Sequence, residues 1–196
     1  MIEQSPKLIH AFGALAELGQ EVANKNNFQE TIRTSLHLLS GALGIMRGGV
    51  ARYSRYAREL NMLAVRGLGD EFPLSLSVCV EDERQFLTNG LNSIDAHAAR
   101  VLPFFQVYAT SFERRRIELF VPLIIRDEIV GGLFLGEKAT GEPYSSYEKE
   151  IICAMGRHIG VAISQRNLLA EIERHSEENR KLFDDLRRTY ADTVKA

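Results

Sequence analysis

Apolar and polar positions alternate most clearly between Ile117 and Glu137. An extended run from Ile117 to Ile125 is followed by the polar break Arg126-Asp127-Glu128 and by a second extended run, Ile129 to Leu135. This pattern predicts two antiparallel strands with one buried face. Pro122 has no backbone N–H to donate, so we expect its strand to be an edge or to be bulged at that point.

Gly131 and Gly132 lie inside the second of these strands. Because glycine has no side chain, we expect a helix or a ligand to approach the sheet closely there. A hairpin alone is only marginally stable in water. The remaining segments are therefore expected to cover it.

Helical spacing dominates both ends of the chain. Apolar residues recur at helical intervals between Pro6 and Asn24, and Asn27 is placed to cap a second helix. That second helix carries on one face Phe28, Ile32, Leu36, Leu39 and Leu43, with Arg33, His37 and Ser40 outward or at the rim. A last helical pattern begins near Ser145 and meets no Gly or Pro stop after Gly160 through Ala196.

The segments in between predict short elements. They comprise strands at Met46–Ser54, Leu60–Arg66 and Leu91–Ile94, helices at Val80–Thr88 and Val101–Ala109, and a weak alternation over Pro73–Ser77. The order of elements predicts an α+β domain. We expect a five- or six-stranded antiparallel sheet with the terminal helices on one face and short helices and loops on the other.

The last helix changes character along its length. From Ile151 to Ile163 it is apolar and rich in small residues, which predicts that it packs flat on the domain. Beyond Gln165 it is charged except for a seam spaced alternately four and three residues apart: Leu168, Ile172, His175, Asn179, Leu182, Leu186, Thr189 and Thr193. This heptad predicts a parallel coiled-coil dimer, because a lone helix exposing so much leucine is unstable in water. The alternative is a helix folded back on its own amino-terminal helix.

The stretch from Val121 to Ile172 resembles the closing half of GAF domains. The features that carry the resemblance are Val121-Pro122-Leu123, the turn Arg126-Asp127-Glu128, the glycine strand Val130 to Leu133, Tyr144, Glu148 and the small-residue helix Ala154 to Ala162. In all, the resemblance covers Phe28 to Leu169. It implies a GAF-like fold and a non-catalytic sensory module, which binds a small molecule between the sheet and its loop-side helices, dimerises through terminal helices and signals to an output domain.

The residues depart from two specialised GAF patterns. Cyclic-nucleotide-binding members carry Asn-Lys, Phe and Asp-Glu where this chain has Glu137-Lys138, Tyr144 and Glu148-Lys149. Bilin-binding members use a cysteine usually followed by histidine, whereas Cys79 precedes Val80 and Cys153 lies in the final helix. Neither ligand is implied, and the cofactor, if any, stays open.

The last residues, Arg187 to Ala196, resemble the helix that leads into HD-GYP phosphodiesterase domains. We therefore divide the chain into an amino-terminal helix (1–26), a GAF-like sensor domain (27–165) and a coiled-coil signalling helix (166–196), with an output domain expected beyond it in the same polypeptide. The metal-binding His-Asp pair of an HD-GYP domain is absent from the sequence, so that activity is not assigned to this chain.

The composition of the chain indicates which partners and which cellular location to expect. The net charge of −2 offers no general attraction to nucleic acid or to anionic membranes. No apolar run approaches the roughly 20 residues of a membrane span, and the amino terminus lacks a signal-peptide pattern. Cys79 and Cys153 lie in separate segments, which suits a reducing compartment. We expect a cytoplasmic, soluble protein.

The candidate ligand lining is mostly aromatic, as small-molecule pockets usually are. It comprises Cys79, Asp95, Phe104, Phe105, Tyr108 and Phe120. Plain core packing of the aromatic residues is the alternative, and it would make the chain a ligand-free dimerisation module. A third possibility, a reductase of the same fold such as a free methionine sulfoxide reductase, needs several cysteines near the pocket, and this chain has two scattered ones.

Other candidate chemistry is sparse. The sequence has no Gly-rich phosphate loop, HExxH, CxxC or G-x-S-x-G, so we expect neither catalytic residues nor a metal site. Cys79 could be a reactive thiol, although a buried apolar cysteine is commoner. The run Glu113 to Arg116 could clamp an anionic ligand or be a solvated charge run.

Overall fold

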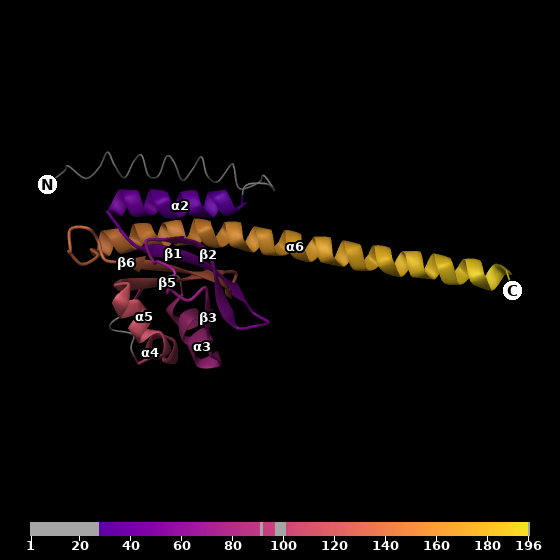
Figure 1. The fold of residues 1–196 in the computed structure, drawn as a ribbon, viewed down its shortest axis with the longest axis horizontal. Helices are drawn as coiled ribbons and strands as arrows, with labels where there is room; N and C mark the ends of the chain where they lie inside the picture. The colour runs from indigo at the N-terminus through magenta and orange to yellow at the C-terminus, as the bar shows by residue number, and fades with distance from the viewer. Residues whose placement is uncertain (1–27, 91, 97–100, 196) are drawn as a thin grey trace. The chain divides into compact units, whose positions relative to one another are not determined.

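The computed structural model describes residues 28–90, 92–96 and 101–195, with side chains as far as Phe183 (Figure 1). The helix predicted over Pro6–Asn24 and the cap at Asn27 lie outside these residues. The chain divides into two compact units, one ending at Ile163 and the other beginning at Ser164. None of the helices in the described ranges combines the length and the hydropathy needed to cross a membrane.

The first unit is built on a six-stranded antiparallel sheet, in agreement with the predicted α+β class. The strand order is β3-β2-β1-β6-β5-β4. The strands are β1 (Gly48–Ser54), β2 (Glu59–Arg66), β3 (Ser75–Ser77), β4 (Ile94–Asp95), β5 (Ile117–Ile125) and β6 (Glu128–Gly136). The weak alternation over Pro73–Ser77 is thus a short edge strand.

The predicted central hairpin is β5 and β6. Arg126 and Asp127 form its turn with φ of 51° and 61°, the left-handed geometry that matches the twist of a two-residue hairpin. Glu128 belongs to β6 rather than to the break. Pro122 pairs with Gly132 and lies beyond the two paired residues of β4, so the expected sheet edge at Pro122 is confirmed within the described part of the chain.

Two long helices pack on one face of this sheet, as Figure 1 shows. They are α2 (Phe28–Leu43) and the first part of α6 (Ser146–Lys195). Their buried residues include the predicted positions Ile32, Leu36 and Leu39 of α2, and Ile152, Met155 and Ile159 of α6. The prediction for Ser40 is wrong: it is 1% exposed because it follows Leu36 by one helical turn and lies on the same face.

Three short helices cover the opposite face (Figure 1). They are α3 (Val80–Asn89), α4 (Pro103–Val107) and α5 (Ala109–Arg114). The first two were expected, whereas α5 was not. The sheet therefore separates two apolar cores, a mainly aliphatic one under α2 and α6 and an aromatic-rich one under α3, α4 and α5.

Candidate functional site

Phe104 of α4 lies at the centre of the aromatic-rich core. Its ring centroid is 5.3 to 6.4 Å from the rings of Phe86, Phe105, Tyr108, Phe112, Phe120 and Phe134. Phe104 and Phe105 are each 1% exposed, and Phe120 is fully buried. We call these seven residues the aromatic cluster. Edge-on and tilted ring pairs of this kind stabilise a core beyond the area they bury.

The structure brings together four of the residues predicted to line a ligand: Phe104, Phe105, Tyr108 and Phe120. Their rings contact one another in the region where the ligand was expected. The hydroxyl of Tyr108, the residue between α4 and α5, accepts a hydrogen bond from the backbone N–H of Ser77 in β3 at 2.7 Å. Cys79 and Asp95 are exposed. The ligand lining itself stays a prediction.

Side chains approach the sheet closely at Gly131 and Gly132, from α6 on one face and from the aromatic cluster on the other. A Cβ on Gly131 would lie 3.3 Å from Cδ1 of Ile163 in α6, which confirms the predicted approach of a helix. A Cβ on Gly132 would lie 2.5 Å from Cε2 of Phe120. On the aromatic side, the ring of Phe120 therefore occupies the space that the glycine leaves.

Asp82, which the sequence reasoning missed, joins two of the short helices. It is 1% exposed, and its Oδ1 accepts from the backbone N–H of Phe104 at 3.1 Å. Its Oδ2 accepts from the backbone N–H of Cys79 at 3.3 Å and from the thiol at 2.9 Å. The spacing Cys-x-x-Asp before the predicted helix carried the signal, since an acidic residue at the third helical position can close a capping box.

Cys79 is therefore not the buried apolar cysteine that was the commoner expectation. It is exposed at the amino-terminal end of α3, where its sulfur accepts from the backbone N–H of Asp82 at 3.5 Å. A helix cap needs contact with the first turn rather than burial, which explains the exposure. Cys153 is half-buried in α6, and burial raises the pKa of its thiol.

Three of the positions compared with the nucleotide-binding pattern, the retained Lys138 and the altered Tyr144 and Glu148, form internal contacts. Lys138, 8% exposed, donates to both carboxylate oxygens of Glu148 at 3.0 and 3.1 Å and lies 5.8 Å from the ring centre of Tyr144. The hydroxyl of Tyr144 donates to the carbonyl of Gly136, and burial raises its pKa, with Glu118 and Glu148 adding to the effect. These contacts fasten the loop after β6 to the start of α6.

Glu148 also closes the first turn of α6. Its carboxylate accepts from the backbone N–H and the hydroxyl of Ser145 at 2.8 and 2.9 Å, while the hydroxyl of Ser145 accepts from the backbone N–H of Glu148 at 3.2 Å. This is a reciprocal capping box. Burial acts to raise the pKa of Glu148, but the hydrogen bonds from Ser145 and Lys138 outweigh it and leave the pKa below its usual value.

We expect Glu148→Gln to lower the free energy of unfolding by about 2 kcal/mol at pH 7, less than for a fully buried ion pair because Glu148 keeps some exposure. Since the folded-state pKa is depressed, the contribution of Glu148 is present above its unfolded pKa, roughly 4.3, and is lost as pH falls through the folded value. The difference between the two proteins should therefore shrink below about pH 4.3.

Urea unfolding followed from pH 3 to pH 7 measures this difference. The exposed Glu150→Gln, in the same helix, is the matched control and should change little at either end of the range. A Glu148→Gln difference that stays constant with pH would show that the carboxylate charge plays no part.

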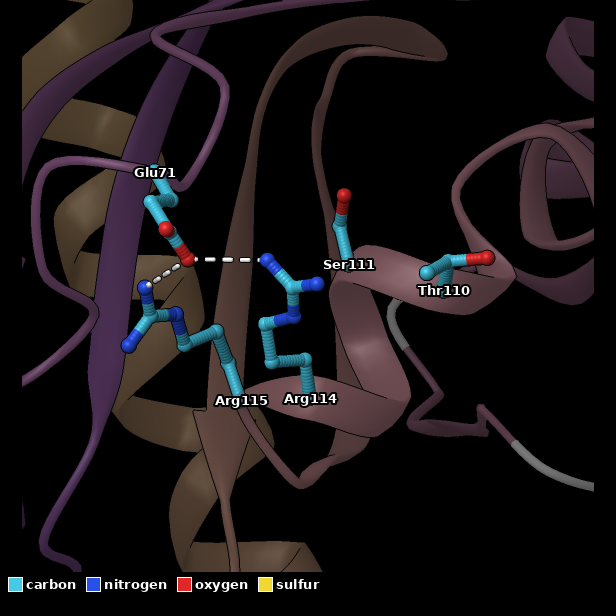
Figure 2. A pocket seen from close by; sticks show the side chains of 5 residues that line it. All are labelled: Glu71, Thr110, Ser111, Arg114 and Arg115. Atoms are coloured by element: carbon cyan, nitrogen blue, oxygen red, sulfur yellow. Dashed lines mark hydrogen bonds and ion pairs between the residues drawn. The ribbon is translucent and has the colours of Figure 1, made fainter.

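The charge run Glu113 to Arg116 is not simply solvated. Arg114 and Arg115 contact Oε2 of Glu71 at 2.9 and 3.1 Å, whereas Arg116 binds both carboxylate oxygens of Glu137 at 2.9 and 2.8 Å. Figure 2 shows the carboxylate of Glu71 facing the ends of both arginine side chains. Together with Thr110 and Ser111 of α5, these residues line a small pocket of about 80 Å³.

A second hollow lies over α2 and β2. It has a volume of about 350 Å³, is shallow and open, and is lined by Arg33, His37, Met62, Leu63, Ala64, Val65 and Leu74. Neither of these two hollows is lined by the residues predicted to hold a ligand. Among the residues that the structure describes, no three His, Cys, Asp or Glu side chains gather as they would around a metal ion.

Comparison with solved structures agrees with this architecture, although no protein-family model matches the chain. The GAF domain of a Coxiella burnetii phosphoenolpyruvate-protein phosphotransferase is 16% identical with a TM-score of 0.62, covering 85% of this chain and 99% of that one. A Geobacter sulfurreducens GAF domain/HD domain protein is 20% identical with a TM-score of 0.54, covering 79% and 98%.

A domain of a putative two-component sensor histidine kinase from Sinorhizobium meliloti is similar as well. It is 16% identical with a TM-score of 0.51, and the match covers 74% of this chain and 95% of that one. At these sequence identities the structural similarity is evidence for the fold alone. The chain has the fold of GAF domains.

Proposed function

We propose that the chain is a non-catalytic sensory or regulatory GAF module that binds a small ligand and relays its presence through α6. The observation that carries this proposal is the position of β5 between the two cores. Phe120 enters the aromatic cluster from one face of the strand, while Val121 and Leu123 face α6 on the other. A ligand that moved Phe120 would thus act on the same strand that packs against α6.

The contact between β5 and α6 is close because the helix carries glycines there. A Cβ on Gly156 would lie 3.2 Å from Cδ2 of Leu123, and a Cβ on Gly160 would lie 3.4 Å from Cδ1 of Ile125. Packed interfaces of this kind switch between discrete arrangements rather than deform smoothly. A ligand that binds one arrangement better than another would shift the balance by its difference in affinity.

The setting proposed for this module is bacterial-type signal transduction in the cytoplasm. One protein with the same fold carries a signalling name, a putative two-component sensor histidine kinase, and another is a GAF domain/HD domain protein. The similarity of Arg187 to Ala196 to the helix before HD-GYP domains supports an output domain of that type, a cyclic-dinucleotide phosphodiesterase, in the same polypeptide.

The packing of the aromatic cluster favours a second candidate, a ligand-free dimerisation module whose interior is filled by its own side chains. Native mass spectrometry of gently purified protein and thermal shifts across nucleotides and small metabolites separate the two. A retained molecule or a specific shift supports the sensor. A protein that is consistently empty and shifted by none of them supports the ligand-free module.

Dimerisation through the seam of the second unit is part of both candidates. In the single chain Leu168, Ile172 and Leu182 are 59%, 55% and 62% exposed, and His175 and Asn179 are exposed as well. The side chain of Leu186 lies outside the described residues. A heptad seam with this much exposed leucine and isoleucine is the surface that a second copy of the helix would cover.

We expect Leu182→Asp to weaken the dimer at least about tenfold, since it removes a seam leucine and places a carboxylate there in both copies. Lys181→Asp introduces the same side chain one residue away, on the solvated face, and should leave the dimer unchanged. Sedimentation equilibrium of the two variants makes the comparison. Equal dimer strength in both would exclude this seam as the interface.

A further inference from the structure

We propose that the pocket lined by Glu71, Thr110, Ser111, Arg114 and Arg115 binds a phosphate-type oxyanion, and that Glu71 occupies it in the absence of ligand. In the structure two guanidinium groups converge on a single carboxylate oxygen, at 2.9 and 3.1 Å. Within the lining, two positive charges thus face one negative charge (Figure 2). The lining therefore keeps one net positive charge when Glu71 is in place, and that charge favours binding of an anion.

Arg115 is the less exposed of the two arginines that line the site. The side chain of Arg115 is 23% exposed and lies against Gly69, where a Cβ would come within 3.1 Å of its guanidinium nitrogen. Gly69 has φ of 70°, a backbone conformation that favours glycine and keeps this space free of a side chain. A partly buried arginine loses less side-chain entropy when it binds an anion than a fully exposed one does.

The present occupant is weakly held by comparison. The side chain of Glu71 is 65% exposed and belongs to the segment between β2 and β3, while its partner Arg114 is 62% exposed. Exposed ion pairs stabilise proteins little. An external anion can therefore displace Glu71 without disrupting the core.

The donors select the class of ligand. Guanidinium groups match the geometry of phosphate oxygens, and the polar residues Thr110 and Ser111 belong to the same lining. The volume of about 80 Å³ is small, so the pocket admits one oxyanion group, and the rest of any larger ligand would lie outside it. That group is inorganic phosphate or the phosphate of a larger phosphomonoester. The site does not depend on the proposed sensory role.

Phosphate binding to the full chain tests the assignment directly. Nuclear magnetic resonance titration with inorganic phosphate, at constant ionic strength, follows the side-chain N–H signals of Arg114 and Arg115. Glu71→Gln removes the competing carboxylate charge and should bind phosphate roughly two- to fivefold more tightly than the unaltered protein. Adding Arg114→Gln to that variant should abolish the gain.

Glu128→Gln is the matched control, because Glu128 is 68% exposed and also pairs with an arginine, Arg55 at 3.2 Å. It should bind phosphate as the unaltered protein does. A Glu71→Gln variant that binds no more tightly than this control overturns the proposal, as does acetate binding equal to phosphate binding. Glycerol 3-phosphate binding more tightly than phosphate assigns the site to a phosphomonoester, and equal or weaker binding assigns it to inorganic phosphate.

Discussion

Replacing Phe104 with alanine is expected to lower the free energy of unfolding by about 3 to 5 kcal/mol. The ring is 1% exposed and contacts six other aromatic rings, so its removal loses both buried apolar area and the contacts around the resulting cavity. Guanidinium chloride unfolding should show a lower midpoint with an unchanged slope, the sign of altered stability rather than altered compactness.

Val107→Ala provides the control within the same short helix. Val107 is 72% exposed, so its truncation should change stability by no more than about 0.5 kcal/mol. The cavity left by Phe104→Ala offers a second measurement, because a dry apolar cavity binds benzene-sized molecules. Saturating benzene should raise the melting temperature of the variant and leave that of the unaltered protein in place. Equal costs for the two truncations would mean that the aromatic cluster is not a packed core.

The second large effect is expected for Gly131→Ala, at about 3 kcal/mol of destabilisation. A Cβ at this position would lie 2.2 Å from the carbonyl oxygen of Ala51. Because β6 is paired on both sides, neither neighbouring strand can move aside without disturbing the sheet. Urea unfolding of the variant measures the cost, and a strand shift should also appear as altered amide signals along β1.

Gly41→Ala is the natural comparison for this substitution. Gly41 lies near the end of α2, and a Cβ there would have no heavy atom within 4 Å. Alanine should stabilise that helix by about 0.5 to 1 kcal/mol. Opposite signs for the two glycine-to-alanine changes are the expected result. Destabilisation by both would point to glycine's backbone freedom rather than to steric contact.

The local patterns of the chain account for most of the fold. The hairpin from Ile117 to Leu135 could be predicted because strand alternation and turn chemistry are properties of neighbouring residues. The same holds for α2 and for α6 up to Ile163, where apolar spacing sets the buried face. Helix α5 could not be predicted in this way, since its six residues are too few to show a period and only Phe112 is buried.

The partners of charged residues could not be read from one sequence. Arg114, Arg115 and Arg116 are adjacent, yet the first two pair with Glu71 and the third with Glu137. Likewise, the carboxylate of Asp82 reaches the backbone of Phe104, 22 residues away. Such pairings depend on how the loops cross the sheet, which no local periodicity encodes. The four aromatic residues predicted to line a ligand do lie together, but the way their rings pack depends on the same tertiary geometry.

Strand β5 also bears on how the first unit unfolds, because it contributes side chains to both cores. Leu119 and Val121 belong to the aliphatic core, and Phe120 between them belongs to the aromatic one. A shift in the register of this strand would remove buried side chains from both cores at once. We therefore expect the two cores to unfold together. The first unit should therefore unfold in a single cooperative transition, in which the helices on both faces of the sheet unfold together.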